Sequence, residues 1–195
     1  MNLRHAAGAS MMGAFLLLAG CNPMDLSDFA DRRPELLPER FFAGELRGWG
    51  LEFGPLGGIG RRIEVQASGR FDEATQTLTL EETYRFDDGH DDRLRWQIRR
   101  LGDGRYEATE ARAPEPGEGQ AAGSAFRLTY RRDVPQTDGS STVLSFDDWF
   151  IRIDRDTVMV RATISKLALP IGSMTVLYRR VDAAQASEPA PAAGD

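Results

Sequence analysis

The residues best suited to chemistry are two adjacent carboxylates, Asp147 and Asp148, set among apolar and aromatic residues. The surrounding run, residues 143–153, alternates apolar and polar side chains in the pattern that predicts a β-strand with one buried face. Neighbouring side chains on a strand point to opposite faces, so the two carboxylates cannot work together as an acid–base pair. One of them must therefore point inward.

The inward carboxylate is predicted from the face on which the apolar residues lie. Val143, Trp149 and Ile151 share a face with Asp147, and this register places Asp147 inside beside Trp149. A buried carboxylate needs a partner. The candidate partners are Arg161 and Lys166 on the strand that follows, and Arg127 and Arg131 nearby. A structural ion pair is the simpler interpretation of such a contact, and contact with a ligand is the alternative.

Histidine and cysteine offer little further chemistry. His90 is the single histidine after the first twenty residues, and it lies in the acidic turn Asp87–Asp92, which is poor support for a fixed catalytic base. Zinc and iron sites usually draw on several His or Cys side chains. The acidic turn also lacks the length and the distal glutamate of a calcium loop. We therefore predict no metal and no cofactor, and an enzyme based on carboxylates is the least favoured hypothesis.

The N-terminus has the pattern of a targeting signal. Residues 1–20 combine a basic start at Arg4 with an apolar run that ends in small residues, as in a signal peptide. Leu18–Cys21 resembles the bacterial lipobox at every position, which implies that Cys21 is lipidated and begins the mature chain. By resemblance to sorted lipoproteins, Asn22 favours the periplasmic face of the outer membrane. The alternatives are an ordinary secretory peptide with a cysteine near its end, or a small apolar helix that is retained.

Three other features bound the mature chain. Removal of residues 1–20 leaves 23 basic against 30 acidic residues, a net charge of −7 that argues against nucleic acid as a partner. Residues 21–40 contain prolines and mixed charge, which predicts a tether with one helical turn near residues 25–31. Residues 182–195 are rich in Ala and Pro and are predicted to form a disordered tail.

Residues 41–181 have the pattern of a β domain. Alternating runs recur at steady spacing between turn signals such as Asp88–Gly89, which predicts about eight to ten strands in an antiparallel meander. In the run that follows the acidic pair, Val158, Val160, Ala162 and Ile164 share the predicted inner face. A sheet of this size would expose its edges unless it closed. We therefore predict an all-β, lipocalin-like barrel, with a β-sandwich as the alternative.

The aromatic residues are predicted to lie in the core, and they line a pocket only if the barrel is hollow. With a hollow barrel, the candidate ligand-binding residues are Trp149, Asp147, Arg161, Trp49, Tyr84, Trp96 and Tyr130. The glycine-rich loop Phe53–Gly60 leads into a strand rather than a helix, so a nucleotide site is not expected there. Its apolar residues, Leu56 and Ile59, are predicted to fold back on the core, with a portal or lipid contact as the alternative.

Four segments of the chain resemble one bacterial family. They are SFDDW at 145–149, RATISK at 161–166, GDGRYEAT at 102–109 and GQAAGSAFRLTY at 119–130. The family is catalogued as domain of unknown function 3833 and consists of small lipoproteins; the resemblance covers about residues 41–180. It implies a β domain in the cell envelope and supplies no activity.

Two functional hypotheses follow from these features. The first is a lipid-anchored envelope protein whose barrel binds an apolar or amphipathic small molecule. The second is a non-catalytic envelope lipoprotein that has a filled barrel and docks a protein partner. The size of the internal cavity distinguishes them, because a void of a few hundred cubic ångströms favours a ligand.

Overall fold

The computed structural model describes residues 24–136 and 139–181. The predicted signal peptide, the lipobox with Cys21 and the C-terminal tail lie outside the described residues. Within the described ranges, no helix is long and apolar enough to cross a bilayer.

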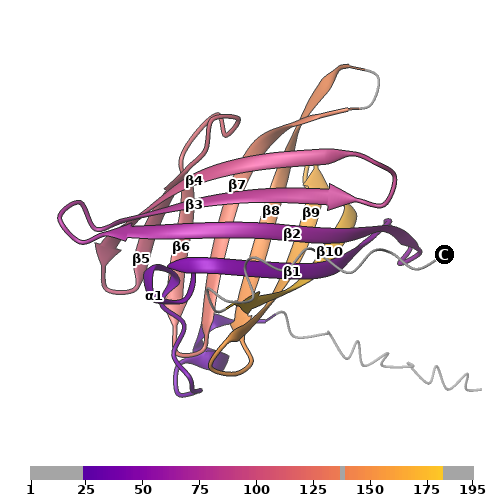
Figure 1. Cartoon of the computed structure of the whole chain (residues 1–195). Helices are drawn as coiled ribbons and strands as arrows, with labels where there is room; N and C mark the ends of the chain where they lie inside the picture. The colour runs from indigo at the N-terminus through magenta and orange to yellow at the C-terminus, as the bar shows by residue number, and fades with distance from the viewer. Residues whose placement is uncertain (1–23, 137–138, 182–195) are drawn as a thin grey trace, which may run out of the picture.

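Ten antiparallel strands form a closed barrel, in which each strand pairs with the next along the chain and β1 pairs with β10 (Figure 1). The strands are β1 (Gly44–Phe53), β2 (Ile59–Asp72), β3 (Thr77–Phe86), β4 (Asp91–Gly102), β5 (Arg105–Thr109), β6 (Gly117–Ala122), β7 (Ala125–Pro135), β8 (Ser141–Arg152), β9 (Thr157–Lys166) and β10 (Leu169–Arg180). The predicted meander, its closure and its strand number are confirmed. Closure leaves no unpaired sheet edge, which explains why a barrel is formed rather than a sandwich.

The inner face of β9 agrees with the sequence pattern, whereas the inner face of β8 does not. Val158, Val160 and Ala162 are buried in the barrel as predicted. On β8, however, the interior is lined by Leu144, Phe146, Asp148 and Phe150. The predicted register of β8 is therefore wrong by one residue, and Trp149 lies on the outer face.

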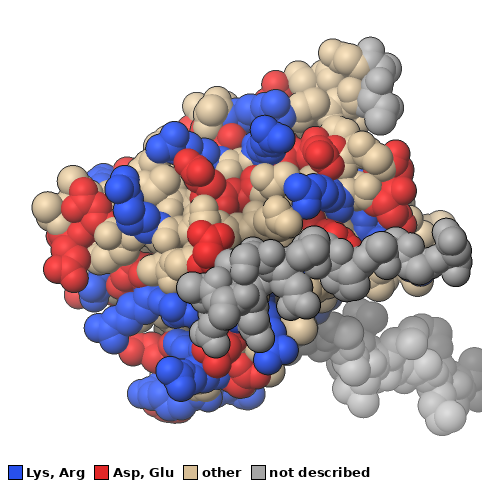
Figure 2. Space-filling model, in the orientation of Figure 1, with Lys and Arg blue, Asp and Glu red and all other residues tan. Residues whose placement is uncertain are grey.

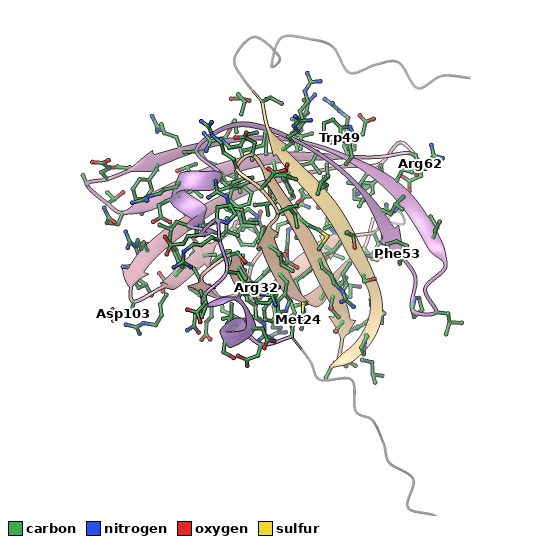
Figure 3. All side chains as sticks on the ribbon, turned by 90° about the horizontal axis from the view of Figure 1, so that it is seen from below. Met24, Arg32, Trp49, Phe53, Arg62 and Asp103 are labelled. Atoms are coloured by element: carbon green, nitrogen blue, oxygen red, sulfur yellow. The ribbon has the colours of Figure 1, made fainter. Side chains whose placement is uncertain are left out.

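The outer face of β8 is covered by the N-terminal segment, which is why apolar residues occur there. A short 3₁₀ helix, η1 (Leu26–Phe29), is capped by the Asp25 side chain and places the ring of Phe29 6.0 Å from that of Trp149. Trp149 is only 6% exposed although it points away from the barrel interior. The helical turn predicted near residues 25–31 is thus present, and it packs against the barrel wall (Figure 3).

The rest of this segment closes one end of the barrel. Helix α1 (Pro38–Phe41) and its flanks bury Leu36, Phe41 and Phe42 almost completely. The prediction of a tether over residues 21–40 is therefore wrong for the described part, residues 24–40. The reason is that Leu36 and the Phe41–Phe42 pair supply apolar surface that the barrel end can bury.

Aromatic rings fill the end that α1 closes. Phe42 makes edge-to-face contacts with Phe41, Phe150 and Tyr178 at centroid distances of 5.0, 5.7 and 5.9 Å. The backbone of Phe42 also passes so close to Gly69 on β2 that a Cβ there would lie 1.9 Å from the Phe42 carbonyl oxygen. Glycine at position 69 is required for this contact.

Candidate ligand-binding cavity

The opposite half of the barrel is hollow. A cavity of about 360 Å³ extends from the rings at the closed end toward the β1–β2, β3–β4, β7–β8 and β9–β10 connections. Its wall is mainly aromatic and aliphatic, and includes Leu80, Phe86, Leu94, Trp96, Phe126, Leu128, Phe146, Ile164 and Met174. We call the end near these four connections the mouth.

The mouth carries exposed apolar side chains. Leu56 in the β1–β2 connection is 99% exposed, and Leu167 in the β9–β10 connection is 90% exposed; Ile59 and Leu169 beside them are also largely exposed. Leu56 and Ile59 therefore do not fold back on the core as predicted. Since β1 pairs with β10, these two connections are neighbours at the mouth.

A polar band crosses the interior between the filled end and the mouth. It consists of Glu82 and Tyr84 on β3, Tyr130 on β7, Asp148 on β8 and Tyr178 on β10, all of which border the cavity. Glu82 and Asp148 are each only 7% exposed. Two buried carboxyl groups are thus held in a mainly apolar interior, where charge is costly.

Glu82 has two tyrosine neighbours. The Tyr178 hydroxyl donates to Glu82 Oε1 at 2.7 Å, and the Tyr84 hydroxyl lies 3.4 Å from the same oxygen. The two hydroxyls are 2.7 Å apart. Burial raises the pKa of Glu82, although the hydrogen bonds from the tyrosines oppose this shift. Burial and the nearby Glu82 charge raise the pKa of both tyrosines well above the usual range, so they remain neutral donors.

Only one of the two Asp148 carboxyl oxygens has a hydrogen-bond partner. The Tyr130 hydroxyl donates to Asp148 Oδ2 at 3.0 Å, whereas Oδ1 has no hydrogen-bond partner. Burial raises the pKa of Asp148 to about 8; the Tyr130 hydrogen bond opposes this, and the Glu82 charge adds to it. In the empty cavity at neutral pH, Asp148 is therefore mostly protonated.

The two arginines that border the cavity are already paired. Arg132 donates to both Asp92 oxygens at 2.7 and 2.9 Å and lies 3.3 Å from Glu110, which ties the β5–β6 connection to the wall. Arg61, near the mouth, pairs with Glu52 at 2.7 Å and lies over the Phe86 ring. Neither guanidinium neutralises Asp148 directly.

The structure divides the predicted ligand-binding residues into two groups. Tyr84, Trp96 and Tyr130 border the cavity. Trp149, Asp147, Arg161 and Trp49 lie on the outer face of the barrel, because each is one residue out of register with the lining positions of its strand. Trp49 is 47% exposed and lies outside β1 in Figure 3.

Asp147 lies on the outer face of the barrel, contrary to the prediction that it points inward. Its carboxylate forms a bidentate ion pair with Arg127 at 2.7 and 2.8 Å on the outer face. The predicted ion pair is thus present with one of the candidate arginines, but the inward carboxylate is Asp148. On the face shown in Figure 2, acidic and basic side chains are interspersed.

Sequence reasoning missed several polar residues of the cavity, among them Glu82, Asp92, Arg132, Asp148 and Tyr178. The sequence pattern does indicate an inward position for Glu82, since this residue shares the strand face of Leu80 and Tyr84. In the part of the chain that the structure describes, no three His, Cys, Asp or Glu side chains cluster as they would around a metal ion.

A closed antiparallel barrel with an internal cavity open at one end defines a lipocalin-like protein. The chain belongs to the family described as "Protein of unknown function (DUF3833)", which matches residues 15–180. Among solved structures, the fold is similar to that of the S-type phycobiliprotein lyase CPES from Guillardia theta, with a TM-score of 0.54 and 9% identity over 83% of this chain and 99% of that chain. No curated protein sequence matches the chain significantly.

Proposed function

We propose that this protein binds an apolar or amphipathic small molecule inside its barrel while it is anchored to the cell envelope by lipid on Cys21. The observation that carries the proposal is the cavity of about 360 Å³, which is lined mainly by aromatic and aliphatic side chains. Small-molecule sites usually have this size and character, with a few polar groups that orient the ligand.

The cavity favours this function over the docking of a protein partner by a filled barrel. Well-packed interiors contain few voids larger than a water molecule, so an apolar space of this size would be costly to maintain for stability alone. The lyase of similar fold adds only that such a barrel occurs in a protein of quite different sequence.

Occupancy is tested with a soluble form that begins at residue 22, which retains every residue the structure describes. We expect mass spectrometry of the purified protein to detect a co-purified apolar molecule. Ile164→Trp, which adds bulk inside the cavity, should remove it. Leu177→Trp, on the exposed outer face of β10, is the matched control and should retain it. Equal ligand content in both variants would contradict the proposal.

The anchor is tested separately on the full chain. Because Cys21 is the only cysteine, Cys21→Ser should release the protein from membranes or leave it unprocessed. In wild type, fractionation should place the protein with the outer membrane, as Asn22 predicts. A Cys21→Ser protein that stays with membranes through detergent-free washes would exclude lipid anchoring.

A further inference from the structure

The polar band indicates which head group a ligand of the cavity carries. Asp148 borders the cavity, is nine-tenths buried, and leaves Oδ1 without a partner. Buried polar atoms in native proteins are normally hydrogen-bonded, so an orphaned oxygen beside an open cavity marks a place for a ligand atom.

The protein itself does not supply that partner. The Tyr130 hydroxyl is used by Oδ2 of the same carboxyl group, and the Tyr178 hydroxyl is used by Glu82. The Arg132 guanidinium donates to Asp92 and Glu110. When Asp148 is ionised, Oδ1 therefore lacks a donor, and a ligand in the barrel can supply it.

The charge of the band restricts the ligand further. Glu82 and Asp148 are close enough for the Glu82 charge to raise the pKa of Asp148. A fatty-acid carboxylate or a phosphate would bring further negative charge and acceptor oxygens to this place. Both are disfavoured wherever Glu82 or Asp148 is ionised, because like charges repel strongly in a desolvated interior.

We propose that the cavity takes an amphiphile with a protonated amine head, which donates to Asp148 Oδ1 beside Glu82 while the apolar chain extends toward the mouth. This inference rests on the proposed ligand-binding function and names its ligand class. An ammonium group supplies both the donor that Oδ1 lacks when Asp148 is ionised and a positive charge that favours ionisation of the two buried carboxyl groups.

The walls around the band suit such a ligand. Tyr130 stacks on Phe146 with ring centroids 4.8 Å apart, and Trp96 meets Tyr130 edge-on at 4.8 Å, so a cluster of aromatic rings adjoins the hydroxyl that donates to Asp148. Toward the mouth, an apolar path runs along Phe146 and Ile164, beside the ion pairs Arg132–Asp92 and Arg61–Glu52 that also line the cavity. The exposed leucines of the mouth continue this apolar path outward.

The proposal predicts a pH dependence with a definite sign. The groups that act on Asp148 are Tyr130 from β7, Glu82 and Tyr84 from β3, and the charge of the adjacent Asp147 on the outer face. Because an ammonium binds the ionised carboxylate, binding below pH 8 must displace the Asp148 proton. Affinity should rise about tenfold per pH unit up to about pH 8 and then level off, since an alkylamine stays protonated to about pH 10.

The test compares decylamine, decanol and decanoate by titration calorimetry on the soluble form that begins at residue 22. We expect decylamine to bind at least about tenfold more tightly than either analogue at pH 8. Asp148→Asn should abolish this preference and the pH dependence. Asp147→Asn, which changes the adjacent carboxylate on the outer face, is the matched control and should keep both.

Each other outcome is decisive. Decanoate binding as tightly as decylamine, or an amine preference that survives Asp148→Asn, would overturn the head-group assignment while the apolar-ligand function stands. No binding of any of the three, together with no co-purified molecule, would overturn both. If Asp148→Asn does not fold, Glu82→Gln and the pH series on the unaltered chain test the same assignment: a flat pH profile refutes it.

Discussion

The two ends of the barrel are built from the same alternating strands but differ in what occupies the space between them. At the closed end, residues of the N-terminal segment enter the barrel, and Phe42 contacts three other rings. At the mouth, no described segment enters, and a cavity of about 360 Å³ remains. The strands thus define a container, and a short non-strand segment decides which part of it is solid.

The largest expected effect is at the closed end. Phe42→Ala would remove a fully buried ring, and we expect a loss of about 3–5 kcal/mol in the free energy of unfolding. Phe146→Ala removes a ring that borders the cavity, where space is already present, and should cost less, about 1–2 kcal/mol. Urea denaturation measures both, and equal losses would mean that the two ends are packed alike.

The next effect concerns the outer wall. Trp149 is held between β8 and Phe29, so Trp149→Ala should cost about 2–3 kcal/mol while ligand content stays unchanged. Trp49→Ala, at an exposed outer position, is the control and should cost less than about 1 kcal/mol. Loss of ligand in Trp149→Ala without loss of stability would place this ring in the binding site instead.

A smaller effect is expected on the pH dependence of stability, to which Asp148 and the adjacent Asp147 should contribute differently. The folded pKa of Asp148 is raised to about 8, so between about pH 4 and pH 8 the folded protein holds a proton that the unfolded chain has lost. This group therefore lowers stability as pH rises, by up to about 1.4 kcal/mol per unit. Asp148→Asn should remove that slope and Asp147→Asn should not; denaturation at pH 5, 6 and 7 gives the difference.

The smallest effect is expected at the mouth. Leu56→Ser and Leu167→Ser change highly exposed side chains, so the free energy of unfolding should move by less than about 0.5 kcal/mol. If these residues guide an apolar ligand into the barrel, uptake of decylamine should slow in stopped-flow measurements. A large loss of stability would show that the mouth is packed and would remove its contrast with the closed end.

The accuracy of the sequence prediction differs between the two strands of one hairpin. On β9 the apolar residues occupy one face only, and Val158, Val160 and Ala162 are buried as predicted. On β8 both faces are apolar, since Phe146 and Phe150 alternate with Trp149 and Ile151. Alternation gives the period of a strand, but it cannot give the inner face when both faces are covered.

The sequence by itself determined the strands, their meander and the closed barrel, because period-two alternation and turn residues act locally. It also offered Tyr84, Trp96 and Tyr130 as pocket lining if the barrel was hollow, and these three residues border the cavity. Only the tertiary structure decided that the N-terminal segment fills one end, that Asp147 pairs outside and that Asp148 lies unpaired within. Those outcomes depend on contacts between residues far apart in the chain, such as Phe29 with Trp149 and Phe42 with Tyr178, which no local pattern encodes.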